Sequence, residues 1–553
     1  MTSSFETTLF PIVQTINEYL SNYILVFLLL GVGLWYSIKT RFVQVRCFGE
    51  GMKKVFGNLS LRGGKQERGM SSFQALATAI AAQVGTGNIV GASGAILTGG
   101  PGAIFWMWII AFFGMATIYA EATLALKTRF VQVRCFGEGM RKVFGNLSLR
   151  GGKQERGMSS FQALATAIAA QVGTGNIVGA SGAILTGGPG AIFWMWIIAF
   201  FGMATIYAEA TLALKTRVID KDGTIHGGPV YYITTAFKGA FGKFLAGFFA
   251  VAIILALGFM GCMVQSNSIG STFQTAFGVP SWIVGLVLVV ICGVIFLGGV
   301  QRLASVTEKI VPIMAAIFLV GGLIILAVRV KYIPATFAMI FKYAFQPQAI
   351  IGGTFGYAIK TAVSQGAKRG LFSNEAGMGS TPHAHAQANV ADPHDQGVVA
   401  MIGVFIDTFV VLTLNALVII STLYTSDGIL ASGVIPEGIG KANLAQTAFG
   451  TIFGSGLGAA FVAICLFFFA FSTVLSWNLF GKINVIYLFG KKSAKVYSVI
   501  ALVFIFLGTI MSNDLVWELT DMFNNLMVIP NAIALFALTG MVVRSTHGVG
   551  AGK

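Results

Sequence analysis

Charged residues are scarce in this sequence. Asp, Glu, Lys and Arg make up only 10% of its 553 residues, whereas soluble globular proteins carry about 25%. Hydrophobic residues account for 56%, so the chain has too little polar surface for a soluble enzyme. The 36 Lys and Arg exceed the 20 Asp and Glu, but this excess is spread over short segments between apolar runs, which argues against a nucleic-acid binder. The composition is typical of a polytopic, all-α membrane protein.

Cysteine is also rare, with five residues in the chain. Cys47 and Cys135 occupy the same position in two copies of a repeat, and the others lie within apolar stretches. No disulfide framework is therefore predicted. The first 22 residues lack a basic segment and contain Glu6 and Glu18, which does not fit a cleaved signal peptide.

The chain contains a tandem repeat of 88 residues. Residues 40–127 and 128–215 align without a gap and differ only at Lys53, which is Arg141 in the second copy. Such near-identity indicates a recent in-frame duplication and not a solenoid. Removing one 88-residue copy from the 553 residues leaves 465 for the ancestral protein.

Long apolar runs predict the membrane spans, because about 30 Å of hydrocarbon must be crossed. The runs cover residues 22–38, 71–97, 103–126, 159–185, 191–214, 244–266, 281–300, 309–330, 346–368, 400–424, 456–484, 496–511 and 516–541. The sequence thus predicts about 13 spans, or 11 without one repeat copy. Each copy carries two spans, so the duplication leaves the orientation of everything downstream unchanged.

Basic residues predict the orientation of the chain. If the segment 39–68 is cytoplasmic, four of the 36 Lys and Arg lie outside, and the rest lie on or toward the cytoplasmic side. The four are Arg329, Lys331, Lys342 and Lys441. The N-terminus is therefore expected outside and the C-terminus in the cytoplasm.

The first functional signal is a span interrupted near its middle. Residues 159–185 contain Gly173, Thr174, Gly175 and Asn176 in a row, and these residue types are weak helix formers. Unwinding would free backbone groups at membrane depth, which is tolerated only where they line a cavity or a ligand. The following half-helix would then present its N-terminal end to an anion such as a carboxylate. A packing face of small residues explains this motif equally well when it is taken alone.

A second interruption lies in the span 346–368, where residues 352–356 read GGTFG. Without one repeat copy and the leading span, ten helices remain, and the two interrupted ones are the first and the sixth. Paired interruptions in two five-helix halves are typical of transporters with inverted repeats and a binding site at the membrane midplane.

Polar residues inside other spans add candidates for the site. Ser472 and Thr473 stand side by side in the span 456–484, where two hydroxyls and backbone carbonyls could supply hard oxygen ligands for a small cation. They could instead bond carbonyls one turn earlier in their own helix, the more common role of such a pair. The polar stretch 265–267 (Gln-Ser-Asn) closes the third core helix and could face the cavity or lie at the outer end of that helix.

Ionisable groups inside apolar spans are functional suspects. Glu209, with its copy-one equivalent Glu121, and Asp407 are such groups. Glu209 lies near the cytoplasmic end of its span, so a structural partner such as a loop arginine is expected. Three histidines in a cytoplasmic loop have loosely metal-like spacing, but no cysteine accompanies them in the sequence, and a metal site there is a minor alternative. They are His383, His385 and His394.

Several motifs together resemble the alanine or glycine:cation symporter family. They are GTGN in the interrupted span, GGPGAIFWMW after it, GGPVYYI at 227–233, VQSN at 264–267 and, most specifically, RGLFSNEAGMGS at 369–380. The resemblance covers essentially the whole chain, with one repeat copy in excess. It implies a leucine-transporter-type fold of five plus five inverted helices, with helices 1 and 6 discontinuous, after a leading helix. It also implies sodium-driven uptake of alanine or glycine across a bacterial inner membrane, without a cofactor other than Na⁺ as the coupling ion.

The resemblance assigns roles to individual residues. The GTGN motif would hold the substrate carboxylate and supply backbone carbonyls to the ion. Its residues are Gly173, Thr174, Gly175 and Asn176, or their copy-one equivalents Gly85, Thr86, Gly87 and Asn88. Gln265 would reach the amino acid, and Phe355 would close over its small side chain. Ser472 and Thr473 match the hydroxyl pair of the sodium site in this type of fold.

The duplication leaves open which copy occupies the core. From the last residue of a copy to Phe244, where the next core helix begins, the interval is 29 positions for copy two and 117 for copy one. Copy two is therefore expected to form core helices 1 and 2, and copy one an extra hairpin. The expected segments are 1–39 (outside segment and leading helix), 40–127 (extra hairpin), 128–217 (core helices 1–2), 218–330 (helices 3–5), 331–541 (helices 6–10) and 542–553 (cytoplasmic tail).

Two further classes of function stay open on the sequence alone. The duplication could have produced a transport-inactive relic or a sensor of amino acids, since the core motifs are present in either case. An intramembrane hydrolase would need a serine and a histidine together at membrane depth, but all five histidines fall in loops or the tail. The sequence does not indicate an oligomeric state.

Overall fold

The computed structural model describes residues 4–19, 128, 131–144, 158–221, 225–297, 299–345, 365–366 and 369–547. These residues are mostly helical, and β1 (Val218–Ile219) and β2 (Ile225–His226) pair as a short antiparallel hairpin. The predicted leading helix and nearly all of repeat copy one, including Gly85, Thr86, Gly87 and Asn88, lie outside the described residues. So does most of the predicted span 346–368, with Phe355.

The helices of the first half begin with α1 (Ser4–Tyr19). Repeat copy two contains α8 (Val131–Arg134), α9 (Phe136–Phe144), α10 (Ser160–Gln171), the π-helical turn η3 (Gly175–Gly179), α11 (Ala180–Gly187) and α12 (Ala191–Thr216). The following residues form α13 (Pro229–Ala236), α14 (Gly239–Ile253), η4 (Ile254–Gly261), α15 (Cys262–Phe277), α16 (Ser281–Leu297), α17 (Gly299–Val328), η5 (Val330–Tyr332) and α18 (Ile333–Phe345).

Residues 369–374 are helical and lead into the second half. Its elements are α20 (Pro382–His385), α21 (Pro393–Val404), η6 (Phe405–Leu412), α22 (Thr413–Ile419), η7 (Ile420–Tyr424), α23 (Leu444–Phe453), α24 (Ser455–Phe489), α25 (Ser493–Ile510), α26 (Asn513–Ala537) and α27 (Thr539–His547).

Six helices of the described residues are long and apolar enough to cross a membrane, or up to eight if each bent pair counts as one span. The six are Ala191–Thr216, Gly239–Phe277, Arg302–Val328, Pro393–Tyr424, Ser455–Phe489 and Ser493–Ile510. The bent pairs are Ser160–Gln171 with Gly175–Gly187, and Asn513–Ala537 with Thr539–Ser545. These helices coincide with predicted spans, while the total of about 13 stays a prediction.

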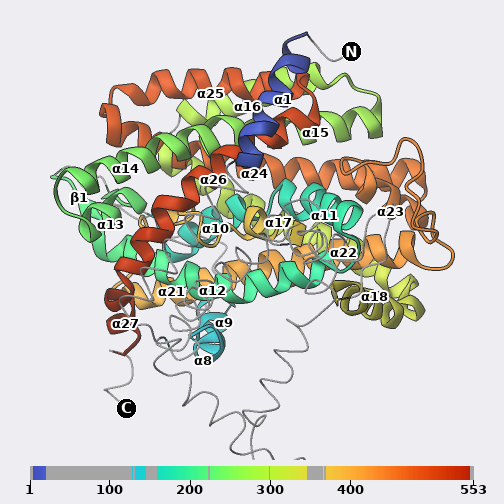
Figure 1. Ribbon diagram of the computed structural model, residues 1–553, viewed down its shortest axis with the longest axis horizontal. Coiled ribbons are helices and arrows are strands. Elements are labelled where there is room, and N and C mark those ends of the chain that lie inside the picture. Colours follow the sequence, from blue (N-terminus) through green and yellow to red (C-terminus); the bar gives the residue numbers. More distant parts are fainter. Residues whose placement is uncertain are drawn as a thin grey trace, which may run out of the picture.

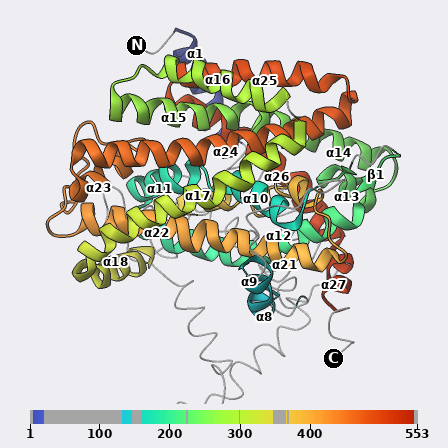
Figure 2. The same cartoon turned by 180° about the vertical axis from the view of Figure 1, so that it is seen from behind.

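The long helix α24 crosses the middle of the molecule in both views (Figures 1 and 2), and the other long helices are arranged around it. On one side lie α15, α16 and α25, which pack against one another. On the other side α12 packs along α21. The short helices α8 and α9 lie beyond this pair, where α9 contacts α21.

Small residues let these helices approach closely. A Cβ at Gly397 of α21 would lie 2.7 Å from atoms of Tyr207 and Thr211 on α12. A Cβ at Gly261 would lie 2.5 Å from the ring of Trp477 on α24. The high glycine content of the chain therefore serves helix packing as well as helix interruption.

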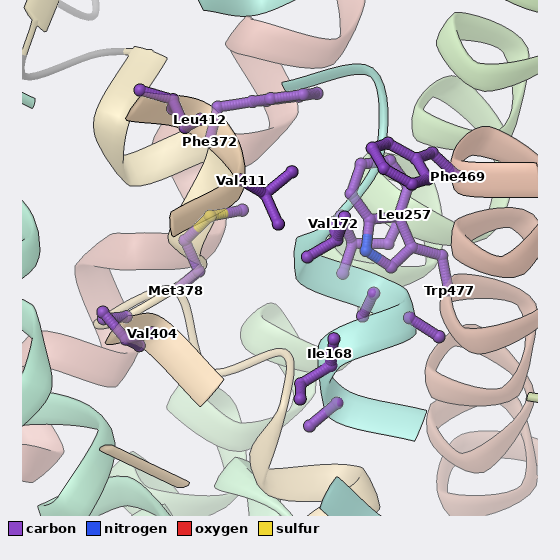
Figure 3. Close-up of a cluster of buried hydrophobic side chains, with 14 of the residues drawn as sticks. Ile168, Val172, Leu257, Phe372, Met378, Val404, Val411, Leu412, Phe469 and Trp477 are labelled. Atoms are coloured by element: carbon purple, nitrogen blue, oxygen red, sulfur yellow. The ribbon is translucent and has the colours of Figure 1, made fainter. Parts of the chain in front are cut away.

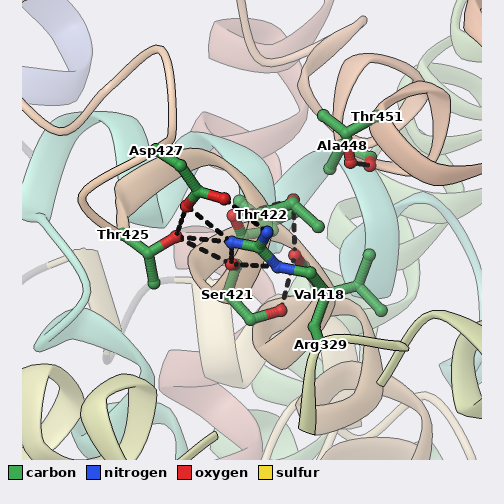
Figure 4. A network of polar contacts seen from close by, with 9 residues as sticks. Arg329, Val418, Ser421, Thr422, Thr425, Asp427, Ala448 and Thr451 are labelled. Carbon is green, nitrogen blue, oxygen red and sulfur yellow. Dashed lines mark hydrogen bonds and ion pairs between the residues drawn. The ribbon is translucent and has the colours of Figure 1, made fainter. Parts of the chain in front are cut away.

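A guanidinium group ties the ends of α17 and η7 together (Figure 4). Arg329 Nε donates to the carbonyl oxygen of Ser421 at 2.9 Å, and its other nitrogens bond Thr425 (2.7 Å) and Asp427 (2.6 Å). The last carbonyls of a helix have no partner within it, so the cation satisfies one of them and complements the helix dipole. The guanidinium also holds the pKa of Asp427 well below its ordinary value, so the carboxylate stays charged until the pH falls through that lowered pKa.

We predict that Arg329→Ala lowers the melting temperature of the detergent-solubilised protein, because hydrogen bonds to a charged group contribute about 1.5–3 kcal/mol. Lys331→Ala is the control, because it removes a neighbouring basic side chain that, among the described residues, contacts the Tyr332 ring (4.9 Å) and not the end of η7. Thermal unfolding between pH 5 and 8 should show the same difference throughout this range. Equal melting temperatures for the two variants would contradict the prediction.

Candidate transport site at an interrupted helix

Helix α10 stops at Gln171, and the chain resumes a helical course at Gly175 with a bend of 41°. In a continuous helix the amide of Gly173 would donate to the carbonyl of Ala169. Here it donates to Asn176 Oδ1 at 2.9 Å instead, and the amide of Thr174 donates to Gln265 Oε1 at 3.2 Å. Two amides and their former carbonyl acceptors are thus released from the helical ladder at the GTGN motif.

The hydroxyl of Thr473 reaches one of the released carbonyls. Thr473 Oγ1 lies 2.8 Å from the Ala169 oxygen and 3.0 Å from the Phe469 oxygen in its own helix α24. A Cβ at Gly173 would lie 2.4 Å from Thr473 Oγ1 and 3.2 Å from Gln265 Oε1. The structure therefore brings together three of the predicted site residues: Gly173 in the interruption, Gln265 on α15 and Thr473 on α24.

Ser472 is placed differently from its neighbour. Its hydroxyl donates to the Phe469 carbonyl at 2.9 Å and contacts the sulfur of Met314 at 3.5 Å. Both hydroxyls therefore bond a carbonyl of their own helix, which was the alternative to an ion site. Of the two, within the described residues, only Thr473 also bonds α10, through the Ala169 carbonyl.

Asn176 links the interruption to the second half of the chain. Its Nδ2 donates to Asp407 Oδ1 at 2.6 Å. The Asp407 carboxylate is fully buried and also accepts from Thr408 Oγ1 at 2.7 Å and Ser373 Oγ at 3.1 Å. Asn415 Nδ2 in turn donates to the carbonyl of Asn176 at 3.0 Å. Asp407, suspected from the sequence, thus belongs to the same network as the GTGN motif.

Some buried polar atoms beside the interruption have no hydrogen-bond partner among the described residues. They include Thr174 Oγ1 and Gln265 Nε2. A buried donor or acceptor left unpaired costs about 1–3 kcal/mol. These two atoms are therefore candidates for bonding to a ligand.

Aromatic side chains that the sequence analysis did not single out lie beside the interruption. The ring of Phe372 is 5.8 Å from that of Trp477, edge to face, and 4.9 Å from that of Trp517. A Cβ at Gly175 would lie 3.2 Å from the Phe372 ring. Two sequence signals could have indicated them: Phe372 is part of the family string at 369–380, and Trp477 follows Thr473 by one helical turn.

Further apolar side chains belong to the same buried cluster as Phe372 and Trp477 (Figure 3). They are Ile168 from α10, Val172 directly after this helix, Val411 and Leu412 from η6, and Phe469 from α24. These buried apolar side chains lower the local dielectric, which strengthens the hydrogen bonds of nearby buried polar groups.

Among the described residues Glu209 pairs with no arginine, contrary to the expectation above. Its Oε1 accepts from the amide of Gly379 at 2.9 Å and from Asn531 Nδ2 at 2.6 Å, and its Oε2 accepts from the amide of Gly377 at 3.2 Å. Gly377 and Gly379 have φ values of 91° and 76°, a conformation that favours glycine. The turn at 375–380 thereby aims two amides at the carboxylate, and these replace a basic partner.

The three loop histidines do not gather at one point. His383 bonds the Ser380 carbonyl and Asn484, His385 bonds Gln396, and His394 bonds Tyr207. Burial lowers the pKa of His383 to about 4, so its ring is neutral at physiological pH. Among the described residues, these three histidines do not bring their nitrogens close enough together to hold one ion, so the minor alternative of a three-histidine metal site is wrong.

A helix interrupted at membrane depth, with freed backbone groups that meet polar side chains of other helices, is characteristic of secondary active transporters. The crystal structure of MhsT in complex with L-phenylalanine is similar over 72% of this chain and 99% of that chain, with a TM-score of 0.50 and 14% sequence identity.

The sodium:alanine symporter family matches residues 6–129 and 125–549, and the chain therefore belongs to it. The sodium/alanine symporter AgcS of Methanococcus maripaludis is 41% identical over 76% of this chain and 90% of its own length. The putative sodium/proton-dependent alanine carrier protein YrbD of Bacillus subtilis is 39% identical over 79% of this chain and 88% of its own length. The probable sodium/glutamine symporter GlnT of the same organism is 38% identical over 75% and 83%. The family and these relatives indicate a sodium-coupled amino-acid symporter in a membrane.

Proposed function

We propose that this protein imports a small neutral amino acid, alanine or glycine, together with Na⁺. The observation that carries the proposal is the meeting of Gly173, Gln265 and Thr473 at the interrupted helix, where Thr473 Oγ1 lies 2.8 Å from the Ala169 carbonyl. The aromatic rings of Phe372 and Trp477 beside this point favour a small side chain over a large one.

The substrate carboxylate is assigned to the segment from Gly173 to Asn176. The N-terminal end of the half-helix that follows carries a partial positive charge, which favours an anion. Thr174 Oγ1 and Gln265 Nε2, both buried without a partner among the described residues, would complete the contacts to the amino acid. Closure by Phe355 remains part of the proposal, on the family resemblance alone.

The Na⁺ ion is assigned to the hydroxyls of Ser472 and Thr473 and to the carbonyls released at the end of α10. Oxygen ligands of this kind suit a hard cation. One Na⁺ moving with a zwitterion carries one net charge, which is worth about 2.3 kcal/mol per 100 mV. A tenfold sodium gradient adds about 1.4 kcal/mol. The sum would sustain an accumulation of several hundredfold.

Repeat copy two is assigned to core helices 1 and 2. The contacts that support this assignment join α10 and the GTGN motif of copy two to α15, to α24 and to Asp407 in η6. The same proposal retains the segment boundaries given above and a five-plus-five core in which helices 1 and 6 are discontinuous. It places the protein in a bacterial inner membrane, with the N-terminus outside and the C-terminus in the cytoplasm.

Uptake of labelled alanine into vesicles containing the purified protein tests the function directly. An inward Na⁺ gradient with a negative interior should drive accumulation, and replacement of Na⁺ by choline should abolish it. Uptake that runs equally well in choline under a pH gradient would overturn the sodium coupling. Absence of uptake under every gradient would favour the transport-inactive or sensor alternative.

The sodium ligands are tested by Thr473→Val, which keeps the side-chain shape but removes the oxygen. We expect the sodium concentration for half-maximal uptake to rise at least tenfold, because a hard-cation site loses a ligand. Thr272→Val is the matched control, since within the described part of the chain the Thr272 hydroxyl bonds only the carbonyls of Ser268 and Ile269 in its own helix. An unchanged sodium dependence in the double variant Ser472→Ala, Thr473→Val would remove both residues from the site.

The choice of repeat copy is tested by one substitution made in each copy. Gly173→Ala places a methyl group 2.4 Å from Thr473 Oγ1 and should abolish uptake, whereas Gly85→Ala should spare it. Gly182→Ala is the control within the same span, because its methyl group would meet Lys441 at an ordinary 3.5 Å. The reverse pattern would place copy one in the core, provided that membrane abundance is equal for all three variants.

A further inference from the structure

Three residues with metal-binding side chains meet where repeat copy two packs against α21. The ligand atoms of Cys135, Glu138 and His394 all lie within 4.8 Å of one another. Cys135 stands between α8 and α9, Glu138 lies in the first turn of α9, and His394 lies in the first turn of α21. The cluster is separate from the candidate transport site and joins two segments that are far apart in the chain.

The imidazole of His394 is oriented as in a metal site. Its side chain is only 1% exposed, and its Nδ1 lies 2.7 Å from the Tyr207 hydroxyl. Its Nε2 has no hydrogen-bond partner among the described residues and lies 3.7 Å from Glu138 Oε2. A histidine that binds a metal through one nitrogen usually bonds a second group through the other, which fixes its tautomer. Tyr207 fills that second role.

The other two side chains are also available to an ion. Lys142 lies 3.0 Å from Glu138 Oε1 and also pairs with Asp395, so the lysine is neutralised and Glu138 Oε2 still faces His394. Cys135 is buried and carries a free thiol. A Cβ at Gly139 would lie 2.8 Å from the Val398 carbonyl, so glycine at this position lets α9 approach α21 closely enough to form the cluster.

We propose that Cys135, Glu138 and His394 bind one Zn²⁺ ion at the junction of α9 and α21. Thiolate, imidazole and carboxylate are the ligands that Zn²⁺ prefers, and three protein ligands leave a fourth tetrahedral position for water. Zn²⁺ bonds of about 2.0–2.2 Å to nitrogen and oxygen place these two tetrahedral ligand atoms about 3.3–3.5 Å apart, so the 3.7 Å between His394 Nε2 and Glu138 Oε2 needs to shorten by only a few tenths of an ångström.

The duplication predicts how many Zn²⁺ ions each chain binds. Copy one contains the same Cys and Glu as Cys47 and Glu50, but His394 lies outside the repeat and occurs once. The chain therefore has two candidate Cys–Glu pairs for one histidine and should bind one Zn²⁺. The ion would fasten the first helices of copy two to α21, so this site also marks which copy is docked there.

Zinc titration of the purified full-length protein tests the site, with an affinity tag other than histidine and after treatment with a chelator. Competition with a chromophoric chelator should give one Zn²⁺ per chain. Cys135→Ser and His394→Gln should each weaken binding at least tenfold, and Tyr207→Phe by about tenfold, because second-shell partners contribute 10–100-fold to metal affinity. Cys47→Ser is the matched control and should bind as the unmodified protein does.

Co²⁺ supplies a readout that does not depend on the stability of any variant. Bound to the unmodified protein in place of Zn²⁺, it should show a thiolate-to-cobalt charge-transfer band that is absent from Cys135→Ser. Absence of this band in the unmodified protein, or equal Zn²⁺ affinity in Cys135→Ser, would overturn the proposal. Loss of binding in Cys47→Ser alone would overturn the assignment to copy two.

Discussion

The backbone inside a membrane has no water to bond, so every amide and carbonyl released from a helix must find a partner within the protein. This constraint governs the surroundings of Gly173 and Thr174. Their amides are bonded by the side chains of Asn176 and Gln265, and the released Ala169 carbonyl is bonded by Thr473. Helices α15 and α24 must therefore converge on the end of α10, and the packing of the described core follows from that convergence.

The same hydrogen bonds connect the interruption to the family string at 369–380. Asn176 bonds Asp407, which accepts from Ser373 within that string. One turn beyond Thr473, the indole of Trp477 donates to Glu375, whose other oxygen accepts from Ser380 at 2.6 Å. A ligand that binds at Gly173 would thus meet groups shared by both halves of the chain, an arrangement suited to coupling the occupancy of a site to helix movement.

Local patterns in the sequence predicted the features that depend on local chemistry. Apolar length predicted the positions of the described spanning helices, and the run of weak helix formers at Gly173 predicted the interruption. The sequence could not predict which groups satisfy a released amide, because that depends on the register between helices. The bond from Asn176 to Asp407 is an example. Glu209 shows the same limit, since a turn with positive φ at Gly377 and Gly379 supplies backbone amides where a basic side chain was expected.

Equilibrium binding of labelled alanine to the purified protein, measured over a range of Na⁺ concentrations, tests the central claim most directly. If the two ligands share the interrupted helix, Na⁺ should tighten alanine binding, and alanine should tighten Na⁺ binding by the same factor, as thermodynamic linkage requires. Alanine binding of equal affinity with Na⁺ and with choline would contradict a shared site at Gly173 and Thr473.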